Sequence, residues 1–362
     1  MNIGYVFPWD IVGDPAAPER LAATGVDAIA LAASYHSTRA ATPFHPAHRV
    51  LEVPHSAFYL PVRRPAYGVL HPHAPTWTPP DAYLQARDAL ASVGLPVHAW
   101  TPLTHNTLLG RLHPELTVRN AFGDRYPHAL CPSHEDVLDY CTRLISEIVE
   151  LGDPAGLILE ACGPMGVTHQ SVHDKTAGAD WSATQSALLS LCFCTACTPK
   201  YPDPRTQARV RTAIDTSATS MQEALGDLTQ PIAHLRTALT TTLLTRLIPA
   251  TQGRPLRLHA STDHWSTGSF AALPPQNQHG LTGAAALCWG PDDEATTNLA
   301  RLAHPARKLG AYTTILPPRP PDPDQLARSF AAYSKAGADE LHLYHLGLAS
   351  QARLAAMTVA LR

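Results

Sequence analysis

Apolar stretches of strand length alternate along the chain with segments whose apolar residues recur at helical spacing. This alternation predicts strands followed by helices, as in proteins built on a parallel sheet. Several helical segments end in glycine just before the next apolar run, at Gly25, Gly94, Gly310 and Gly337, and glycine there is typical of a helix end. Eight strands are predicted: Ile3–Trp9, Ala28–Ser34, Val97–Pro102, Gly156–Glu160, Leu256–Ala260, Gly283–Trp289, Ala311–Leu316 and Glu340–Tyr344.

The long segment 206–248 is expected to hold two helices that are broken near Pro231, because proline interrupts a helix interior. Eight strands alternating with helices favour a closed (β/α)8 barrel, the TIM barrel. An open doubly wound sheet is the alternative, but its first strand normally leads into a glycine-rich phosphate turn, and here that turn reads Phe-Pro-Trp-Asp. The predicted helices span 81–93, 133–151, 206–248, 293–309, 322–336 and 348–361.

The length of 362 residues suits a single barrel domain over 1–362 that carries insertions. Two segments are long enough to be such insertions: 37–79, rich in proline, histidine and aromatic residues, and 161–205. They follow the second and fourth strands, so both are predicted on the C-terminal face, where TIM barrels carry their active sites. Long loops there commonly form lids or pocket walls. A plainer interpretation of 37–79 is that it only packs over the barrel rim.

Composition narrows the classes of partner. Apolar residues make up 45% of the chain, enough for a large core, and the net charge is −3 with no basic stripe, so nucleic acid is not expected as a partner. The start of the chain has neither the basic nor the apolar region of a signal peptide. The chain contains no run of 18 apolar residues, so no membrane span is expected. Seven cysteines in such a chain indicate a reducing, cytoplasmic setting. Self-association into a homo-oligomer is left open.

Three cysteines lie within six residues, in the pattern Cys192-x-Cys194-x-x-Cys197. A turn of this spacing can direct three sulfur atoms at one centre, and a closed structural zinc site needs a fourth ligand. Cys131 is the best candidate, because it lies just before the predicted helix 133–151. A disulfide within the group is the weaker alternative. Of the other cysteines, Cys141 and Cys288 are interpreted as buried apolar residues. Cys162 could be either a buried apolar residue or a metal ligand.

A strand that ends in glutamate, followed by a loop with Cys-aromatic-Cys-x-x-Cys and preceded by a Cys-Pro turn, resembles the catalytic barrel of the family 42 β-galactosidases. The resemblance covers about residues 97–200. It implies that Glu160 is the general acid/base and that Cys131, Cys192, Cys194 and Cys197 bind a structural zinc. Two positions depart from the family pattern. Leu159 stands where the family has asparagine, and the seventh strand ends without the carboxylate that serves as the family's nucleophile.

Glycoside cleavage needs two carboxyl groups. Glu160 closes the apolar strand Gly-Leu-Ile-Leu, so burial is expected to raise its pKa, which would suit a general acid; the structural alternative is a salt bridge in the barrel mouth. Asp263, after the fifth strand, is the first choice for the partner, and Asp10 is a further candidate. Asp292 and Asp293 are interpreted instead as the start of helix 293–309.

Histidine and aromatic side chains gather at the predicted strand ends. Such rings can stack on the apolar face of a sugar, while polar neighbours hydrogen-bond its hydroxyl groups. The histidines could instead bind a second, catalytic metal, and His169 and His173 have the spacing of ligand pairs on a helix. The predicted substrate-binding residues are Trp9, Tyr35, His36, Trp100, His105, Asn106, His169, His173, Trp289 and His342.

Together these features predict a glycoside hydrolase-like enzyme that acts on a small glycoside or sugar-containing metabolite. Glu160 would be its general acid, Asp263 the partner, and zinc its structural cofactor. Two alternatives remain: a metal-dependent lyase, hydrolase or isomerase that uses the histidines, and a carbohydrate-binding barrel without catalysis. Two carboxylates about 5–10 Å apart would favour the hydrolase. Three metal ligands around an open position would favour the metal enzyme.

Overall fold

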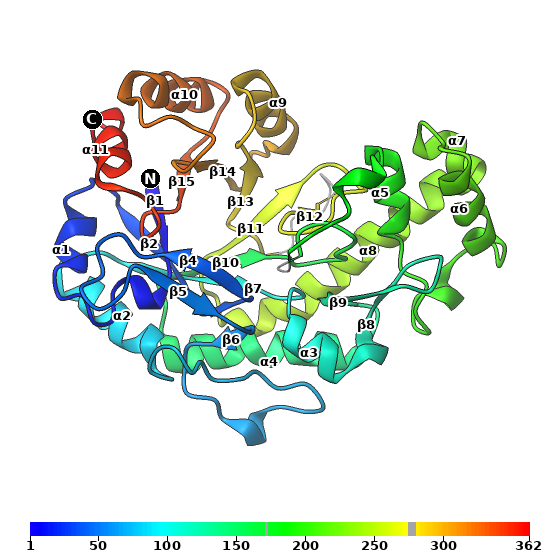
Figure 1. Cartoon of the computed structure of the whole chain (residues 1–362), viewed down its shortest axis with the longest axis horizontal. Helices are drawn as coiled ribbons and strands as arrows, with labels where there is room; N and C mark the ends of the chain where they lie inside the picture. Colours follow the sequence, from blue (N-terminus) through cyan, green and yellow to red (C-terminus); the bar gives the residue numbers. More distant parts are fainter. Residues whose placement is uncertain (171–172, 274–279) are drawn as a thin grey trace.

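The computed structural model describes residues 1–170, 173–273 and 280–362. Its centre is a closed barrel of eight parallel strands in the order β10-β7-β2-β1-β15-β14-β13-β11, which closes where β10 pairs with β11 (Figure 1). Each strand coincides with one of the eight apolar runs, so the predicted TIM barrel is confirmed. The strands are β1 (Asn2–Val6), β2 (Ala28–Ala32), β7 (Val97–Pro102), β10 (Gly156–Glu160), β11 (Leu256–Ser261), β13 (Gly283–Leu287), β14 (Lys308–Thr314) and β15 (Glu340–Tyr344).

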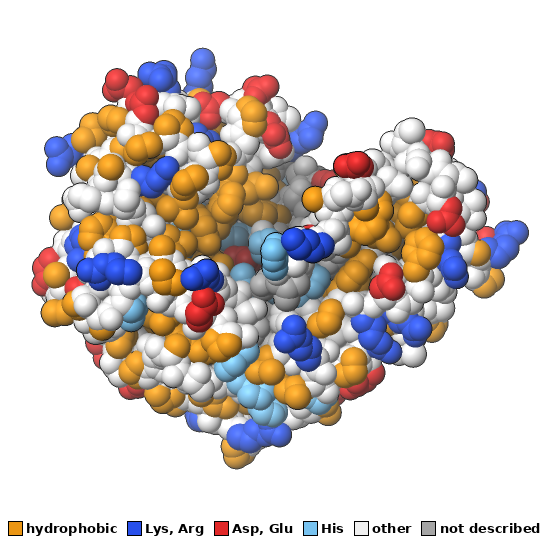
Figure 2. Space-filling view, in the orientation of Figure 1, with side chains coloured by type: hydrophobic (Ala, Val, Ile, Leu, Met, Phe, Trp, Pro, Cys, Tyr) orange, Lys and Arg blue, Asp and Glu red, His pale blue; other side chains and the backbone are white. Residues whose placement is uncertain are grey.

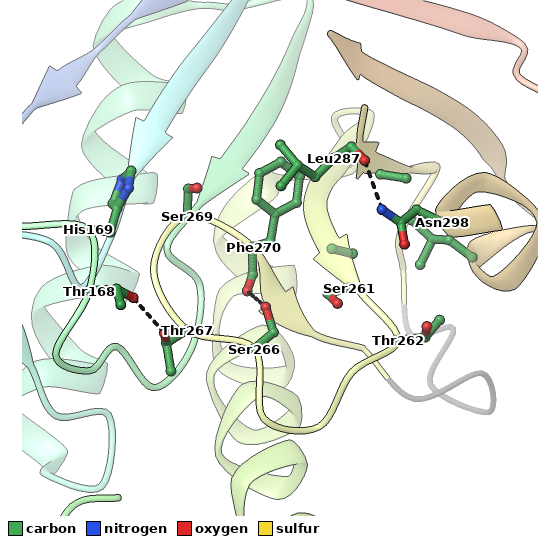
Figure 3. Close-up of a pocket in the computed structure, with 13 residues that line it drawn as sticks. Thr168, His169, Ser261, Thr262, Ser266, Thr267, Ser269, Phe270, Leu287 and Asn298 are labelled. Atoms are coloured by element: carbon green, nitrogen blue, oxygen red, sulfur yellow. Dashed lines mark hydrogen bonds between the residues drawn. The ribbon is translucent and has the colours of Figure 1, made fainter. Parts of the chain in front are cut away.

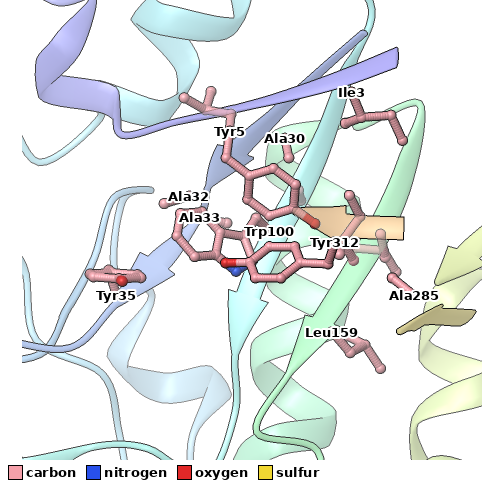
Figure 4. Packing of buried hydrophobic residues seen from close by; sticks show 14 of the residues in the cluster. Ile3, Tyr5, Ala30, Ala32, Ala33, Tyr35, Trp100, Leu159, Ala285 and Tyr312 are labelled. Carbon is pink, nitrogen blue, oxygen red and sulfur yellow. The ribbon is translucent and has the colours of Figure 1, made fainter. Parts of the chain in front are cut away.

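Small residues on two strands make room for large rings inside the barrel. Strand β2 reads Ala-Ile-Ala-Leu-Ala and is buried throughout, and β13 reads Gly-Ala-Ala-Ala-Leu. Tyr5, Trp100 and Tyr312 occupy the space, with ring centroids 5.1 Å apart for Tyr5–Trp100 and 5.3 Å apart for Tyr5–Tyr312, both edge-on (Figure 4). Edge-to-face packing suits the charge distribution of aromatic rings, and an interior filled in this way is a packed core rather than a pore.

Most of the helices surround the barrel. The ordered alternation places α1 (Ala17–Ala22), α2 (Ala82–Ser92), α4 (Glu135–Gly152), α9 (Asp292–Leu302), α10 (Pro323–Lys335) and α11 (Gln351–Ala360) between strands or after the last one. In α4, acidic Glu135 and Asp136 open the helix near its positive end, and Asp153 ends it in a left-handed conformation. No helix in the described ranges is both long and apolar enough to cross a bilayer.

The prediction of a break near Pro231 was wrong. The segment forms α6 (Thr206–Asp215), α7 (Met221–Leu225) and α8 (Thr229–Leu247), and Pro231 lies in the first turn of α8. Proline is tolerated there because the first N–H groups of a helix have no partner within the helix. The interruptions occur instead at Ser217 and Gly226, which both adopt positive φ. The predicted helix 293–309 also ends early, at Leu302, and β14 begins at Lys308.

Loops that leave the C-terminal ends of the strands carry further elements. In segment 37–79, β4 (Thr38–Ala41) and β5 (Val50–Val53) form an antiparallel hairpin, while β6 (Ala57–Phe58) pairs with β3 (Ser34–Tyr35). After β7 come α3 (Thr107–Leu112) and the hairpin β8 (Thr117–Arg119) and β9 (Arg125–Leu130). Segment 161–205 includes α5 (Ala183–Leu189), and its residues 171–172 lie outside the described ranges.

The helices α5, α6 and α7 stand to one side of the barrel (Figure 1). A separate cluster of buried apolar residues, among them Leu188, Val210 and Ile232, joins α5, α6 and α8. The space-filling view shows a hollow between this side and the barrel, with histidine side chains gathered within it (Figure 2). The loops after the strands therefore frame a recess at the C-terminal end of the barrel.

Candidate active site

Glu160 is the last residue of β10 and lies level with Pro102, the last residue of β7. The chain turns directly afterwards, with Ala161 at a φ of 49°, a left-handed value that is uncommon outside glycine. Only 3% of Glu160 is exposed. The strand direction therefore places a buried carboxylate at the C-terminal mouth of the barrel, where the loops can bring other groups to it.

Aromatic and imidazole nitrogens surround this carboxylate. The indole Nε1 of Trp100 donates a hydrogen bond to Oε2 of Glu160 at 2.7 Å. His169 Nε2 lies 3.7 Å from Oε1, and His259 Nδ1 lies 3.8 Å from Oε2. Among the described residues, the ion-pair contacts of Glu160 are with these two histidines.

The expectation of a raised pKa for Glu160 was wrong. Burial on its own raises this pKa, but the nearby imidazoles of His169, His259 and His36 outweigh it and hold the pKa below its usual value. The strand sequence showed the burial but not the polar groups that its own following loop and other strands and loops bring. Glu160 is therefore a carboxylate at neutral pH in the free protein.

Three histidines converge beside Glu160 from loops that follow different strands. The rings of His36 and His105 stack with centroids 4.0 Å apart, and the ring of His169 lies edge-on to His36 at 6.0 Å. One nitrogen of each lies within 4.8 Å of the others. Burial lowers the pKa of His36 to about 4 and holds that of His105 well below its usual value, so both are neutral at pH 7.

His342 lies deeper in the barrel than predicted for a substrate-binding residue. Its Nδ1 is 2.8 Å from the hydroxyl of Tyr5, which is also 2.8 Å from Nε2 of His259. Nε2 of His342 lies 3.4 Å from Oε2 of Glu340, whose two oxygens accept hydrogen bonds from Arg257 at 2.7 Å each. These polar groups form a chain along the barrel interior, from the first residue of β15 toward Glu160.

Several predicted binding residues have local structural partners. The side chain of Asn106 caps α3 by accepting a hydrogen bond from the Leu109 amide at 3.0 Å. Trp9 is buried and stacks on Phe7 at 4.4 Å. His173 is exposed. His169 has a φ of 62°, so it is not in an α-helix and does not form the predicted helical pair with His173.

Two aromatic residues from the prediction do lie near the mouth. Tyr35 stacks on His36 with centroids 4.1 Å apart and contacts Trp100 at 4.8 Å. Trp289 is 37% exposed and stacks on Tyr312 at 5.7 Å. These rings join the aromatic filling of the barrel to its open end, so they can form apolar walls for a ligand.

The candidate carboxylate partners of Glu160 have hydrogen bonds of their own. Asp263 is exposed, and its Oδ1 accepts a hydrogen bond from the Trp265 amide at 2.9 Å within its own turn. Asp10 is buried and accepts a hydrogen bond from the Phe7 amide at 2.8 Å. Burial raises the pKa of Asp10 to about 7. Asp292 opens α9 and accepts hydrogen bonds from two side chains of α10. No described contact joins any of the three to Glu160.

A cavity of about 320 Å³ opens beside His169 and the ends of β11 and β13. Phe270, which stacks on His259 at 5.2 Å, forms one wall of the cavity and links it to the surroundings of Glu160 (Figure 3). Sequence reasoning missed this wall, although the density of hydroxyl residues between 261 and 269 was a visible signal. The hydroxyl side chains that line the cavity are Thr168, Ser261, Thr262, Ser266, Thr267 and Ser269.

His169 and Thr168 also border a second, more open recess of about 610 Å³ on the side toward α5. This recess is lined in addition by Asp174, Asp180 and Trp181, an exposed indole. The two spaces meet at His169, so a ligand longer than one ring can extend from the hydroxyl-lined cavity past the histidine. Asp174 and Asp180 were not among the predicted site residues, because nothing in their local sequence marks them.

The four cysteines form one buried group beside the hairpin β8–β9. The sulfur of Cys131 lies 3.5 Å from that of Cys197 and 3.8 Å from those of Cys192 and Cys194. Tetrahedral ligands at about 2.3 Å from zinc are about 3.8 Å apart, so these spacings fit a metal ion. They are too long for disulfides, and all seven cysteines are free. The amide of Arg119 lies 3.5 Å from the Cys192 sulfur and donates to it.

No family model matches the sequence, and no curated protein matches it. Several solved structures are nevertheless similar to this chain. The chain is similar to α-L-fucosidase isoenzyme 2 from Paenibacillus thiaminolyticus, with a TM-score of 0.57 and 13% identity over 99% of this chain and 49% of that one. The glycoside hydrolase domain of PgaB (BpsB) from Bordetella bronchiseptica has a TM-score of 0.56 and 14% identity, over 95% and 93%.

A family 42 β-galactosidase from G. stearothermophilus is also similar, with a TM-score of 0.54 and 14% identity over 99% of this chain and 56% of that one. The chain thus spans about half the length of two of these three enzymes. At such low identity the likeness concerns the fold. It establishes a TIM barrel similar to the catalytic domains of glycoside hydrolases.

Proposed function

We propose that this protein is a glycoside hydrolase-like enzyme that cleaves a small, uncharged glycoside, with Glu160 as its general acid. The observation that carries the proposal is the position of Glu160: a buried carboxylate at the C-terminal end of a barrel strand, hydrogen-bonded to Trp100 and not paired with arginine or lysine among the described residues. A buried carboxylate at a barrel mouth that is surrounded by imidazole and indole nitrogens is typical of a functional site.

The cavity beside His169 supports a sugar as the ligand. Its described lining offers several hydroxyl groups and the ring of Phe270, but no lysine, arginine or carboxylate. Hydroxyl groups both donate and accept hydrogen bonds, as sugar hydroxyls require, and an aromatic ring packs against an apolar sugar face. A cavity of about 320 Å³ lies at the lower end of the range for small-molecule sites. These properties favour a neutral glycoside over a phosphorylated one.

The state of Glu160 in the free protein is compatible with acid catalysis if the substrate changes its surroundings. The nearby imidazole of His169 lowers the pKa, and His169 borders the cavity from which a substrate would approach. A sugar that takes the place of this contact would leave burial as the main influence, and burial raises a carboxyl pKa. Asp263 remains our proposal for the second carboxylate. For this role, the side chain of Asp263 must break its hydrogen bond with the Trp265 amide.

We also infer that the four cysteines bind an ion, that the ion is zinc, and that its role is structural. Four thiolates around one centre leave no open coordination position for a substrate. The spacing of the sulfurs and their burial support this assignment. The resemblance to family 42 β-galactosidases, whose zinc sites use the same cysteine pattern, supports it as well.

A panel of nitrophenyl glycosides tests the proposal. The wild-type protein should release nitrophenol from at least one member, and Glu160→Gln should lower kcat by ~10²-fold or more, the usual scale for a general acid. Phe58→Leu, a buried change in segment 37–79, serves as a matched control for altered packing. Equal turnover in the wild type and Glu160→Gln would refute the role of Glu160. Binding of a sugar without any cleavage would favour the carbohydrate-binding barrel.

A further inference from the structure

The three histidines at the mouth belong to separate loops, so only the barrel brings them together. His36 follows β2, His105 follows β7 and His169 follows β10. One nitrogen from each lies within 4.8 Å of the others. We propose that His36, His105 and His169 bind a divalent transition-metal ion beside Glu160, separate from the cysteine site. The proposal goes beyond the glycosidase function and does not depend on it.

The orientation of His36 suits a metal ligand. Its Nδ1 is 2.9 Å from the carbonyl oxygen of Ser37, which can only accept a hydrogen bond, so the ring carries its proton on Nδ1. The lone pair is then on Nε2, which can bind a metal ion. Histidine ligands usually donate their other ring N–H to a carbonyl or carboxylate in this manner, which fixes the ring and its tautomer.

Charge at the site also favours a cation. The Oε1 atom of Glu160 lies 3.7 Å from Nε2 of His169, so an ion bound by that nitrogen would sit next to a buried carboxylate. Among the described residues, the ion-pair contacts of this carboxylate are with histidines. A divalent ion would supply the compensating charge, with Glu160 as a fourth ligand or a close counter-ion.

The present spacing requires a modest adjustment. Nitrogens in a tetrahedral site with bonds of 2.0–2.1 Å are about 3.4 Å apart. A separation of at most 4.8 Å must therefore shrink by no more than roughly 1.4 Å. His169 is well placed to supply this movement, because its side chain is 39% exposed and its backbone lies in a loop. The stacked rings of His36 and His105 must tilt apart to direct both lone pairs at one point.

The chemistry of the ligands distinguishes this site from the cysteine site. Imidazole nitrogens suit zinc, copper, iron and nickel, whereas four thiolates favour zinc. Three histidines leave one or more coordination positions open, so the ion should exchange readily and accept a ligand.

Titration calorimetry with NiCl₂ tests the inference without a substrate. Purified protein that already holds one zinc should bind one further equivalent of nickel. His169→Ala should weaken the nickel affinity by ~100-fold or more, above the 10–100-fold typical for the loss of an outer partner. His173→Ala is the matched control in the same loop, because the structure places this exposed residue outside the group. Its nickel affinity should equal that of the wild type.

His105→Asn provides a second test from a different loop and should also abolish tight binding. If this buried substitution prevents folding, as seen in circular dichroism, His169→Ala decides the question, because its partly exposed side chain can be removed without a core defect. The inference is overturned if the wild type binds no nickel beyond the zinc site. It is equally overturned if His169→Ala binds like the wild type, or if His173→Ala loses affinity as well.

Discussion

Each end of the barrel holds a buried glutamate, and the two carboxylates have different partners. Glu340 is the first residue of β15 and Glu160 the last of β10, so in a parallel barrel they lie at opposite ends. Arg257 holds both oxygens of Glu340 at 2.7 Å. Glu160 has Trp100 and histidines instead. A buried carboxylate that is paired with arginine is typical of a structural role. A buried carboxylate that has no arginine or lysine partner among the described residues is typical of a functional site.

A chain of polar groups connects the two ends. It runs from Glu340 through His342, Tyr5 and His259 to Glu160. The Tyr5 hydroxyl has one proton and so can donate to only one of its two histidine neighbours, which means that the other histidine donates to it. Removing one member would leave buried partners unsatisfied, so the chain is expected to fix the positions of the rings below the mouth.

The largest effect is expected at the paired end. Arg257→Met removes the cation and leaves the buried Glu340 carboxylate uncompensated, which should cost about 3–5 kcal/mol of unfolding free energy. Urea denaturation of both proteins measures this loss. The double variant Arg257→Met/Glu340→Gln removes both charges and should recover most of the stability. If it were as unstable as the single variant, lost packing rather than the unpaired charge would be the cause.

A smaller loss is expected outside the barrel, at the cysteine group. Cys194→Ser should release the zinc, which elemental analysis would show as a fall from one equivalent to almost none. Stability should fall by roughly 2–3 kcal/mol, because a closed metal site ties together β8, β9 and the loop before α6. Cys141→Ser is the matched control, a buried thiol in α4 that should keep the zinc. Wild-type protein without zinc would contradict the assignment.

The pH dependence of stability should separate the two ends further. Burial alone would raise the pKa of Glu340, but the hydrogen bonds from Arg257 and His342 outweigh it and hold the pKa well below its usual value. A carboxyl whose folded pKa is depressed adds stability above its unfolded pKa, near 4.3, and that stability is lost as the pH falls. Between pH 6 and pH 3, Glu340→Gln should therefore lose less unfolding free energy than the wild type does. Parallel pH curves would show that Arg257 does not control this carboxyl.

The smallest effect on stability is expected at Asp263. Asparagine can accept the same hydrogen bond from the Trp265 amide, so Asp263→Asn should change the unfolding free energy by less than about 0.5 kcal/mol. Turnover on a cleaved glycoside should nevertheless fall by ~10²-fold if Asp263 is the second carboxylate. Asp263→Ala separates the two roles, since it removes the turn contact as well. Unchanged turnover in both variants would remove Asp263 from the mechanism.

The strands could be predicted from sequence because their signals are local. Apolar runs such as Gly156–Glu160, bounded by helix-ending glycines, mark each buried strand. The convergence of Cys131 with the later cysteines was also accessible, because a closed zinc site requires a fourth ligand. The pKa of Glu160 was predicted in the wrong direction. Its strand shows burial, whereas the histidines that lower the pKa come from other strands and loops.

The remaining differences have similar causes. Pro231 was expected to break a helix, but a proline in the first turn is tolerated, and only the structure shows where the helix begins. His342 was assigned to the mouth, yet its strand places it nearer to the other end. The hydroxyl-rich wall from Ser261 to Ser269 has no helical or strand period, so it was overlooked as an ordinary loop.

The central claim is that Glu160 serves chemistry and Glu340 serves stability. The most direct test is to compare the unfolding free energies of Glu160→Gln and Glu340→Gln with the wild type in urea at pH 7. Glu340→Gln leaves the Arg257 cation buried and unpaired, so it should lose about 3 kcal/mol or more. Glu160→Gln leaves no arginine or lysine unpaired among the described residues and keeps an oxygen for Trp100, so it should lose far less stability than Glu340→Gln. A loss in Glu160→Gln as large as that in Glu340→Gln would contradict the account.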